Sequence, residues 1–235
     1  MPQDSPADSY VGVAGHKLRH ALTAFGLSAR QRICADFGCH IGGFTDCLLQ
    51  DGADRVYAVD TGYGILDYRL RMDARVHVME RTNVLHADPP EDAGGVSLVA
   101  IDVGWTPQAR VLPVACRWVV GSTDPVIISL IKPHYELSAM EESARCEVLG
   151  SDEVNLEGTD PGVGRRGRKG SRAKRRTVIP DAVARRILDH LGRVVFPTVG
   201  VEVLDSTQSP IRGGSSRSHK PGNIEFLALL RPVKQ

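Results

Sequence analysis

Short runs rich in Val and Ile alternate with helix-forming segments along most of this 235-residue chain. Strands of a parallel sheet are covered by helices on both faces, so their sequences are apolar almost throughout. Consecutive parallel strands also need a long crossover connection, which is usually a helix. The alternation therefore predicts an α/β protein built on a mostly parallel sheet.

The predicted elements make up seven strands and their helices. Five early strands are predicted at residues 33–37, 55–59, 75–79, 97–102 and 125–131, with helices at residues 17–25, 43–50, 65–71, 107–120 and 180–191. Two late strands, at residues 194–204 and 223–230, are expected to pair around a loop at residues 205–222. The sequence thus predicts a seven-stranded, mostly parallel sheet that ends in a C-terminal antiparallel hairpin.

The composition excludes several classes of protein. Hydrophobic residues make up 42% of the chain and charged residues 24%, which excludes collagen-like, wholly disordered and disulfide-scaffold chains. No stretch approaches the ~20 apolar residues of a membrane span, and the first residues are polar. We therefore expect a cytoplasmic protein that does not enter a membrane.

The cysteines give no sign of a metal site. The five cysteines include no Cys-x-x-Cys pair. An odd number of cysteines also argues against a disulfide framework. We expect small, mostly buried free thiols at Cys34, Cys39, Cys47, Cys116 and Cys146, and no bound metal.

The chain contains one strongly basic segment, although its net charge is only +1. Residues 165–176 contain eight Lys and Arg and no acid, which leaves 21 basic against 28 acidic residues in the rest of the chain. The eight are Arg165, Arg166, Arg168, Lys169, Arg172, Lys174, Arg175 and Arg176. Interleaved glycines and charge repulsion predict a flexible insertion at about residues 146–177. It is either a solvated loop or an arm that binds phosphates.

A glycine-rich turn follows the first predicted strand. Residues 36–44 read DFGCHIGGF, so that Gly38, Gly42 and Gly43 lie where the strand passes into a helix. Glycine lets the backbone approach a ligand closely, and the helix N-terminus attracts a carboxylate or phosphate. Asp60 ends the second strand, where a carboxylate accepts hydrogen bonds from ribose hydroxyls. These features predict a site for an adenosine-containing cofactor, with a vestigial site as the alternative.

The pattern of the turn indicates which cofactor is expected. A dinucleotide fingerprint needs a glycine two positions after Gly38, where this chain has His40. The pattern Asp-x-Gly-x-x-x-Gly-Gly instead resembles motif I of S-adenosylmethionine-dependent methyltransferases. The resemblance implies a Rossmann-like fold and S-adenosyl-L-methionine as the cofactor.

Two charged residues end neighbouring central strands. Asp102 follows the fourth predicted strand and Lys132 the fifth. Carboxyl ends of strands form the ligand-binding edge of open α/β sheets, so the two side chains could meet beside the cofactor. A neighbouring carboxylate would orient the Lys132 ammonium or stabilise its charge. The alternative is a surface ion pair, but Lys17 in the first helix and Glu225 before the last strand favour a functional site.

These residues resemble those of a known family. A Lys, an Asp, a Lys and a Glu in this chain order, at Lys17, Asp102, Lys132 and Glu225, resemble the catalytic tetrad of FtsJ-like 2′-O-ribose methyltransferases. The chain is most similar to the TlyA (haemolysin A-like) branch. The supporting segments are GGFTDCLLQ at residues 42–50, RVYAVD at 55–60, GYG at 62–64, ERTN at 80–83, IDV at 101–103, KP at 132–133, SPI at 209–211 and GNIE at 222–225.

The resemblance implies a cofactor-binding role for a set of residues. Gly38, Gly42, Gly43 and Phe44 would shape the methionine pocket, Asp60 would hold the ribose and Asn83 would lie near the adenine. Asp36, in the glycine motif, and Asp102 complete the implied set. Residues 1–235 are expected to form a single methyltransferase domain.

The resemblance also implies a reaction and a substrate. The ribose oxygen would attack the sulfonium methyl group in line, while the tetrad aligns it and stabilises its developing charge. Lys132 would accept or steer the 2′-hydroxyl proton. The expected partner is RNA, as rRNA or a ribosomal subunit, in a single-stranded or looped region. Nothing in the sequence indicates an oligomeric state.

The chain departs from the family pattern in three places. TlyA-like proteins usually carry an N-terminal S4 RNA-binding domain, for which the residues before Gly15 leave no room. Residues 39–41, Cys-His-Ile, replace the usual small residues, and residues 104–107, Gly-Trp-Thr-Pro, replace Ser-Phe-Ile-Ser. The basic insertion is longer than expected, and we hypothesise that Arg165 to Arg176 substitute for the S4 domain.

Two other functions are consistent with the sequence. The protein could be a non-catalytic, methyltransferase-like RNA-binding protein, which the altered pocket residues favour and the intact tetrad disfavours. It could also methylate a small molecule or a different atom of a nucleic acid.

Overall fold

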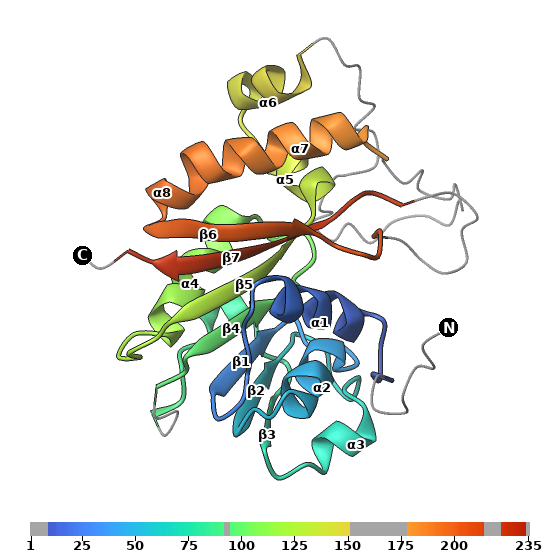
Figure 1. Ribbon diagram of the computed structural model, residues 1–235, viewed down its shortest axis with the longest axis vertical. Helices are drawn as coiled ribbons and strands as arrows, with labels where there is room; N and C mark the ends of the chain where they lie inside the picture. The colour runs from blue at the N-terminus through green and yellow to red at the C-terminus, as the bar shows by residue number, and fades with distance from the viewer. Residues whose placement is uncertain (1–8, 92–94, 151–177, 214–221, 234–235) are drawn as a thin grey trace, which may run out of the picture.

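A single mixed sheet organises the described part of the chain. The computed structural model describes residues 9–91, 95–150, 178–213 and 222–233. Within these ranges seven strands follow the order β3-β2-β1-β4-β5-β7-β6 (Figure 1). The strands are β1 (Ile33–Phe37), β2 (Arg55–Val59), β3 (Val76–Met79), β4 (Leu98–Ile101), β5 (Val126–Ile131), β6 (Val201–Gln208) and β7 (Phe226–Pro232). The predicted fold class is confirmed.

The first five strands are parallel, and the last two are antiparallel. β1 pairs with both β2 and β4, β4 pairs with β5, and β7 returns antiparallel to β5 with β6 at the edge. The chain adds β2 and β3 on one side of β1, then crosses to add β4 and β5 on the other. Such a reversal of strand order leaves a crevice at the carboxyl ends of the strands, where open α/β sheets bind ligands.

Helices cover both faces of the sheet. The helices α1 (Ala14–Ala24), α2 (Gly43–Gln50) and α3 (Tyr68–Arg71) lie on one face, and α4 (Gln108–Trp118), α5 (Pro133–Ala139), α6 (Glu142–Leu149), α7 (Asp181–His190) and α8 (Phe196–Thr198) lie on the other (Figure 1). Cys34 of β1 packs with α1 and α2, whereas Ala35 and Phe37 pack in the opposite cluster with α4. Burial on both faces explains why the strands are apolar at nearly every position.

The prediction for residues 194–204 was wrong at its start. A π-helical turn (Leu191–Val195) continues α7 and leads into α8, so β6 begins only at Val201. Val194 and Val195 favour a strand by propensity, but Leu191 and Phe196 are buried in the core, and their packing keeps the segment helical. Strand β6 also runs to Gln208, into the predicted loop. The sequence did not predict this extension, because the mostly exposed polar residues of the strand show no apolar pattern.

The predicted start of the flexible insertion, residue 146, lies within a helix. Helices α5 and α6 were not predicted, and α6 extends to Leu149 with Val148 buried. Arg186 of α7 holds its end by donating hydrogen bonds to the carbonyl oxygens of Val148 and Leu149, at 2.6 and 3.0 Å. The remainder of the insertion, residues 151–177 with all eight basic residues, lies outside the described residues.

The free thiols differ in their exposure. Cys34, Cys39 and Cys47 are buried and Cys116 is partly buried, as expected. Cys146 is exposed on α6, where burial was expected, because the helix packs through Val148 instead. No helix in the described ranges is long and apolar enough to cross a membrane, and the same ranges contain no cluster of metal-ligating side chains.

Trp118 offers a test of the core between α4 and the sheet. Its ring packs edge-on against Phe37 and Tyr57, with centroids 5.1 and 6.0 Å away, and its Nε1 donates to the Ala87 carbonyl at 3.0 Å. We expect Trp118→Ala to lower the free energy of unfolding by about 3–5 kcal/mol, because it removes a large buried ring and leaves a cavity. Urea unfolding followed by circular dichroism measures the change. A loss as small as that of Val120→Ala, at an exposed site, would contradict this packing.

Candidate cofactor and catalytic site

A cavity of about 570 Å³ lies at the carboxyl edge of the sheet. The loops after β1, β2, β3, β4 and β5 contribute to its wall, together with the start of α1. Its volume is in the range of small-molecule sites in proteins. The predicted site residues that line it are Gly38, Gly43, Phe44, Asp60, Asn83, Asp102 and Lys132.

Gly38 lets the ends of β1 and β4 come together. It has a φ of +88°, and a Cβ atom on it would lie 2.7 Å from the Asp102 carbonyl oxygen. No side chain can be accommodated there without moving the backbone that carries Asp102. The glycine is therefore required by the close approach of two strand ends at the cavity wall.

The paired glycines serve helix packing as well as the cavity. Gly42 has a φ of +103° and faces α3, where a Cβ atom would lie 2.1 Å from Leu70 Cδ1. Gly43 faces α1, where a Cβ atom would lie 2.9 Å from the Gly15 nitrogen. Gly43 lines the cavity but Gly42 does not. Gly42 instead forms the left-handed turn that begins α2.

Asp60 holds two loops at the cavity in place. Its Oδ2 accepts a hydrogen bond from the His40 nitrogen at 2.9 Å, and its Oδ1 accepts one from the Gly62 nitrogen at 2.7 Å. A carboxylate has about four acceptor positions, so two remain for hydroxyl groups of a ligand. The contact also stabilises His40 in a left-handed conformation, with a φ of +49°. Nothing in the residue pattern indicated this backbone contact.

Asp36 supports the site from inside the core and does not line the cavity. It is fully buried, and its Oδ2 accepts a hydrogen bond from Thr45 Oγ1 at 2.7 Å. Among the described residues its Oδ1 has no hydrogen-bond partner. Burial raises the pKa of Asp36 to about 7, and the charges of Asp102 and Asp60 add to the effect while the Thr45 hydrogen bond opposes it.

Two ion pairs stand at the ends of the central strands. Lys132, at the start of α5, pairs with Asp102 after β4, and its Nζ lies 3.4 Å from the Val103 carbonyl oxygen. Lys17 of α1 pairs with Glu225, which precedes β7, at 2.5 Å between Nζ and Oε2. The Lys17–Glu225 pair is almost fully buried, at 8% and 3% exposure. The sequence predicted these four residues and the meeting of Asp102 with Lys132, whereas the burial of the Lys17–Glu225 pair is decided by the fold.

The electrostatic environment keeps Lys132 charged. Burial alone would lower the pKa of Lys132, but the charge and hydrogen bond of Asp102 and the charge of Glu225 outweigh it and raise the pKa above its ordinary value. Glu225 therefore acts on Lys132 across the site, which links the two ion pairs. At neutral pH Lys132 is a hydrogen-bond donor and a cation.

The Glu225 carboxylate fits against a glycine. A Cβ atom on Gly213 would lie 2.1 Å from Glu225 Oε1, so any side chain there would displace the carboxylate. Gly213 is held by an antiparallel bridge to Asn223, whose Oδ1 accepts a hydrogen bond from the Ile179 nitrogen at 2.8 Å. Neither Gly213 nor Asn223 was singled out individually from the sequence, although Asn223 lies in the segment 222–225.

A buried carboxyl group connects the loops that carry Asp102 and Lys132. Glu136 of α5 accepts a hydrogen bond from the Gln108 nitrogen at 3.1 Å, and the Gln108 side chain accepts one from Ser129 Oγ of β5 at 2.7 Å. Burial raises the pKa of Glu136 to about 7. Sequence reasoning missed this contact because its only signal is an acidic residue one turn after Lys132.

Comparison with known proteins gives the family. The FtsJ-like methyltransferase model matches residues 10–156. This chain belongs to the FtsJ-like methyltransferase family. TlyA of Mycobacterium tuberculosis, named a 16S/23S rRNA (cytidine-2′-O)-methyltransferase, is 36% identical over 227 residues, which is 95% of this chain and 69% of that protein.

Two further relatives support the family assignment. YqxC of Bacillus subtilis is 43% identical over 128 residues, or 54% of this chain, and the match spans 45% of the length of that relative. A solved structure from Streptococcus thermophilus, described as a "putative hemolysin", has a TM-score of 0.72 and 28% identity and covers 100% of this chain and 70% of that chain. The FtsJ-like and TlyA-like resemblance inferred from the sequence is confirmed.

The buried Asp36 generates a pH-dependent prediction. Its carboxyl group ionises near its ordinary value of 3.8 in the unfolded chain but keeps its proton up to about 7 in the folded protein. The stabilising contribution is complete below pH 3.8 and is lost as the pH rises through 7. Asp36→Asn cannot ionise, so its stability relative to the natural protein should increase across this window by on the order of 1–4 kcal/mol.

Urea unfolding of both proteins at a series of pH values measures this difference. The pKa of Glu136 is also raised to about 7, but Glu136 is present in both proteins. Its contribution to the free energy of unfolding therefore cancels when the two proteins are compared. Unfolding curves that stay the same distance apart at every pH would rule out a raised pKa at Asp36.

Proposed function

We propose that this protein is an S-adenosylmethionine-dependent 2′-O-ribose methyltransferase that acts on ribosomal RNA. The observation that carries the proposal is the Lys132–Asp102 ion pair at the wall of the cavity formed by the glycine turn. The pair fixes a cation at the carboxyl edge of the sheet, which is where open α/β sheets bind their ligands. The activity for which the Mycobacterium tuberculosis relative is named supports the same reaction. Such a substrate would place the protein in the cytoplasm.

The residues of the cavity fit S-adenosylmethionine. Asp60 has acceptor positions left for the two ribose hydroxyls. Gly38 has no side chain that would fill the cavity at its wall. Phe44, in the first turn of α2, and Asn83, in the loop after β3, line the same cavity as Asp60. When bound, the cofactor supplies an electrophilic methyl group on a sulfonium centre, so the protein need not activate that group.

Lys132 would orient the attacking oxygen. The pair with Asp102 and the contact with the Val103 carbonyl leave the ammonium in one position, from which it donates to the ribose 2′-oxygen. Because its pKa is raised, Lys132 is charged before the reaction and steers the hydroxyl group without accepting its proton. As the oxygen is methylated, that proton would pass to solvent, to which the Lys132–Asp102 pair is partly exposed. Its positive charge also stabilises negative charge that develops on the oxygen during attack.

Lys17 and Glu225 would complete the electrostatic environment. Glu225 helps to keep Lys132 charged, and Lys17 neutralises Glu225 within a nearly dry site. Without Lys17, the buried Glu225 carboxylate would lower the stability of the fold and would attract Lys132 away from Asp102. In this proposal the four charges form one unit that holds the Lys132 ammonium on the substrate oxygen.

Activity of a Lys132 variant tests the proposal. We expect Lys132→Ala to lower kcat on ribosomal RNA by about 10²- to 10³-fold, as for loss of a preorganised donor, while calorimetry shows cofactor binding retained. The assay is transfer of radiolabel from S-adenosylmethionine to rRNA or ribosomal subunits, followed by alkaline hydrolysis. Alkali-resistant dinucleotides carry the label if the 2′-oxygen is methylated.

Arg69→Ala, at an exposed pair on α3, is the matched control. Label that is released by alkali, or transfer that does not depend on Lys132, would contradict the proposed chemistry. Cofactor binding without any labelled RNA would instead favour an RNA-binding protein without activity, or methylation of a small molecule.

The basic segment is our proposed contact with the phosphates of the RNA. Arg165 to Arg176 lie between α6 and α7 in the sequence, and α7 packs against α5, which begins directly after Lys132. We expect replacement of five of the six arginines, at 165, 166, 168, 175 and 176, by Gln to weaken RNA binding. The slope of log K against log salt should fall by about 0.7 for each phosphate that is no longer neutralised. Filter binding over a range of salt concentrations measures both. An unchanged slope would leave the segment without this role.

A further inference from the structure

Glu136 is a buried carboxyl group that the proposed chemistry does not use. It lies in α5 with 5% of its surface exposed, and both of its carboxyl oxygens accept the Gln108 N–H, at 3.1 and 3.4 Å. Burial raises its pKa, and this hydrogen bond opposes the effect. A buried carboxyl group lowers the stability of a fold unless its partners compensate, whereas an apolar side chain does not. The stability of the core therefore does not explain a glutamate at this position.

Glu136 caps a helix to which it does not belong. Gln108 is the first residue of α4, and the residue before it, Pro107, makes no side-chain hydrogen bond to cap the helix. The first N–H groups of a helix have no partner inside it, and a carboxylate near them is favourable. The contact satisfies the N–H of Gln108 and thereby fixes the start of α4 relative to α5.

Gln108 is also tied to the strand that precedes Lys132. Its Oε1 accepts a hydrogen bond from Ser129 Oγ of β5 at 2.7 Å, and both side chains are buried. Lys132 lies between β5 and α5, and its carbonyl oxygen accepts a hydrogen bond from the Glu136 nitrogen at 3.4 Å. The start of α4 is therefore held by both elements that flank Lys132.

The segment between Asp102 and α4 is not held by burial. Residues 103–106 line the cavity, and residues 103–107 are exposed or only partly buried. The Trp105 side chain within this segment is 66% exposed. The position of the segment therefore depends on how its two ends, Asp102 and Gln108, are held.

The Asp102–Lys132 pair needs such support from its surroundings. Both side chains are partly exposed to solvent, in contrast to the nearly buried Lys17–Glu225 pair. Solvent weakens the attraction between partly exposed charges, so this attraction does not by itself hold two side chains in one geometry. The positions of the two backbone segments therefore decide whether the Lys132 ammonium stays in place.

We propose that Glu136 is a positioning residue, which holds the segment of Asp102 against Lys132 through its hydrogen bonds to the start of α4. The inference rests on the proposed function and adds a residue that does not touch the substrate. An acceptor oxygen on residue 136 is enough for this role, because a hydrogen bond from the Gln108 N–H does not require a charged acceptor. Displacement of the Lys132 ammonium by about 1 Å would slow methyl transfer by about 10²-fold.

Two replacements of Glu136 separate the hydrogen bond from the packing of the side chain. Glu136→Gln keeps an acceptor oxygen, whereas Glu136→Leu is apolar and has none. We expect Glu136→Leu to lower kcat on rRNA by about 10- to 100-fold, and Glu136→Gln to keep most of the activity. The Kd for S-adenosylmethionine should stay unchanged in both, because Asp60 and the glycine turn lie on other loops. Glu142→Leu, at an exposed position in the first turn of α6, is the matched control.

Variants of Gln108 remove the same hydrogen bond from the other side. Gln108→Pro lacks the N–H, and proline is well tolerated at the first position of a helix. Pro107 has a ψ of 149°, which suits a residue that precedes a proline. Gln108→Ala keeps the N–H and loses only the side-chain contact with Ser129, so it is the control. We expect kcat to be about tenfold lower in Gln108→Pro than in Gln108→Ala.

A double variant shows whether the two changes act through one hydrogen bond. Adding Glu136→Leu to Gln108→Pro should cause no further loss of kcat, because the bond is already absent. Losses that multiply would mean that the two residues act separately, and would overturn the inference.

Hydrogen–deuterium exchange follows the segment without any substrate. In Glu136→Leu, exchange of residues 103–108 should become faster than in the natural protein, because the Gln108 N–H has lost its acceptor. The amides of β4 should stay protected in both proteins. Faster exchange throughout the sheet would show a general loss of structure and would contradict a local positioning role.

The outcomes separate this inference from the proposed function. Full activity of Glu136→Leu on rRNA overturns the positioning role and leaves the proposed function intact. Lost cofactor binding in Glu136→Leu, or a Glu136→Gln variant as slow as Glu136→Leu, overturns the inference as well. If Glu136→Leu does not fold, the comparison of Gln108→Pro with Gln108→Ala decides. Absence of rRNA methylation by the natural protein overturns both proposals.

Discussion

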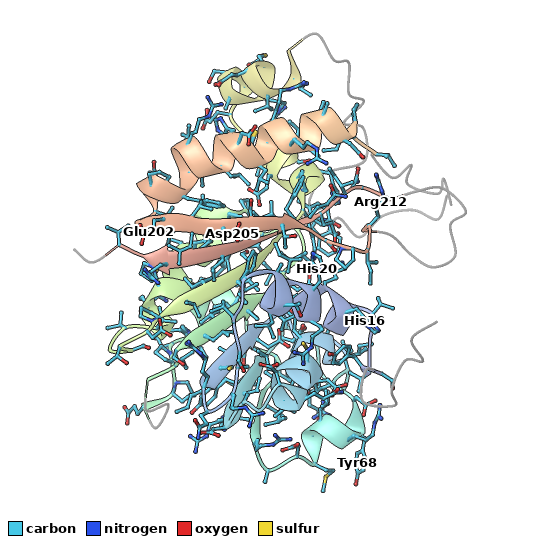
Figure 2. All side chains as sticks on the ribbon, viewed as in Figure 1. His16, His20, Tyr68, Glu202, Asp205 and Arg212 are labelled. Carbon is cyan, nitrogen blue, oxygen red and sulfur yellow. The ribbon has the colours of Figure 1, made fainter. Side chains whose placement is uncertain are left out.

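A buried ion pair between Lys17 and Glu225 joins the first helix to the last strand. The two residues are 208 positions apart, and their 2.5 Å contact is nearly excluded from solvent. Leaving one charge of a buried pair without its partner costs about 3–5 kcal/mol, so each residue constrains the other's position. The pair holds α1 beside β7, and a hydrogen bond of 3.0 Å between His20 of α1 and Thr207 of β6 fixes the same helix one turn later (Figure 2).

The position of α1 determines the shape of the cavity. Helix α1 contacts α2 through Gly15 and Gly43, where a single Cβ atom would already be too close. The start of α1 also forms part of the cavity wall. The Lys17–Glu225 pair positions α1, and α1 in turn packs against the glycine turn at Gly43. Helix α1 thereby connects distant parts of the sequence at one site.

The site was largely predictable from sequence where residue type and strand position agree. Asp60, Asp102 and Lys132 end parallel strands, and the carboxyl ends of such strands must share an edge. The contributions of Asp36 and Gly42 were harder to predict, because their motif positions do not show that one is buried in the core and the other faces α3. Glu136 and Gly213 were missed because their partners are far away in sequence.

The late part of the chain was less predictable than the early part. Strands β1, β2, β4 and β5 are buried on both faces, so an apolar run alone is enough to predict them. Strand β6 lies at the edge with mostly exposed side chains, and it carries no such pattern. The segment before it is rich in Val yet helical, since burial of Leu191 and Phe196 outweighs the local preference of Val194 and Val195.

By itself the sequence determined the α/β class, the glycine turn and the identity of the charged residues, because these depend on periodicity and residue chemistry that are local. Only the tertiary structure decided that the Lys17–Glu225 pair is nearly buried, that the surrounding carboxylates outweigh the effect of burial on the pKa of Lys132, and that Trp105 is left exposed beside it. Those properties depend on distances and burial between loops far apart in the chain. The energy of a charge pair and the cost of desolvation vary steeply with distance and burial. The order of residues in the chain does not give these distances directly.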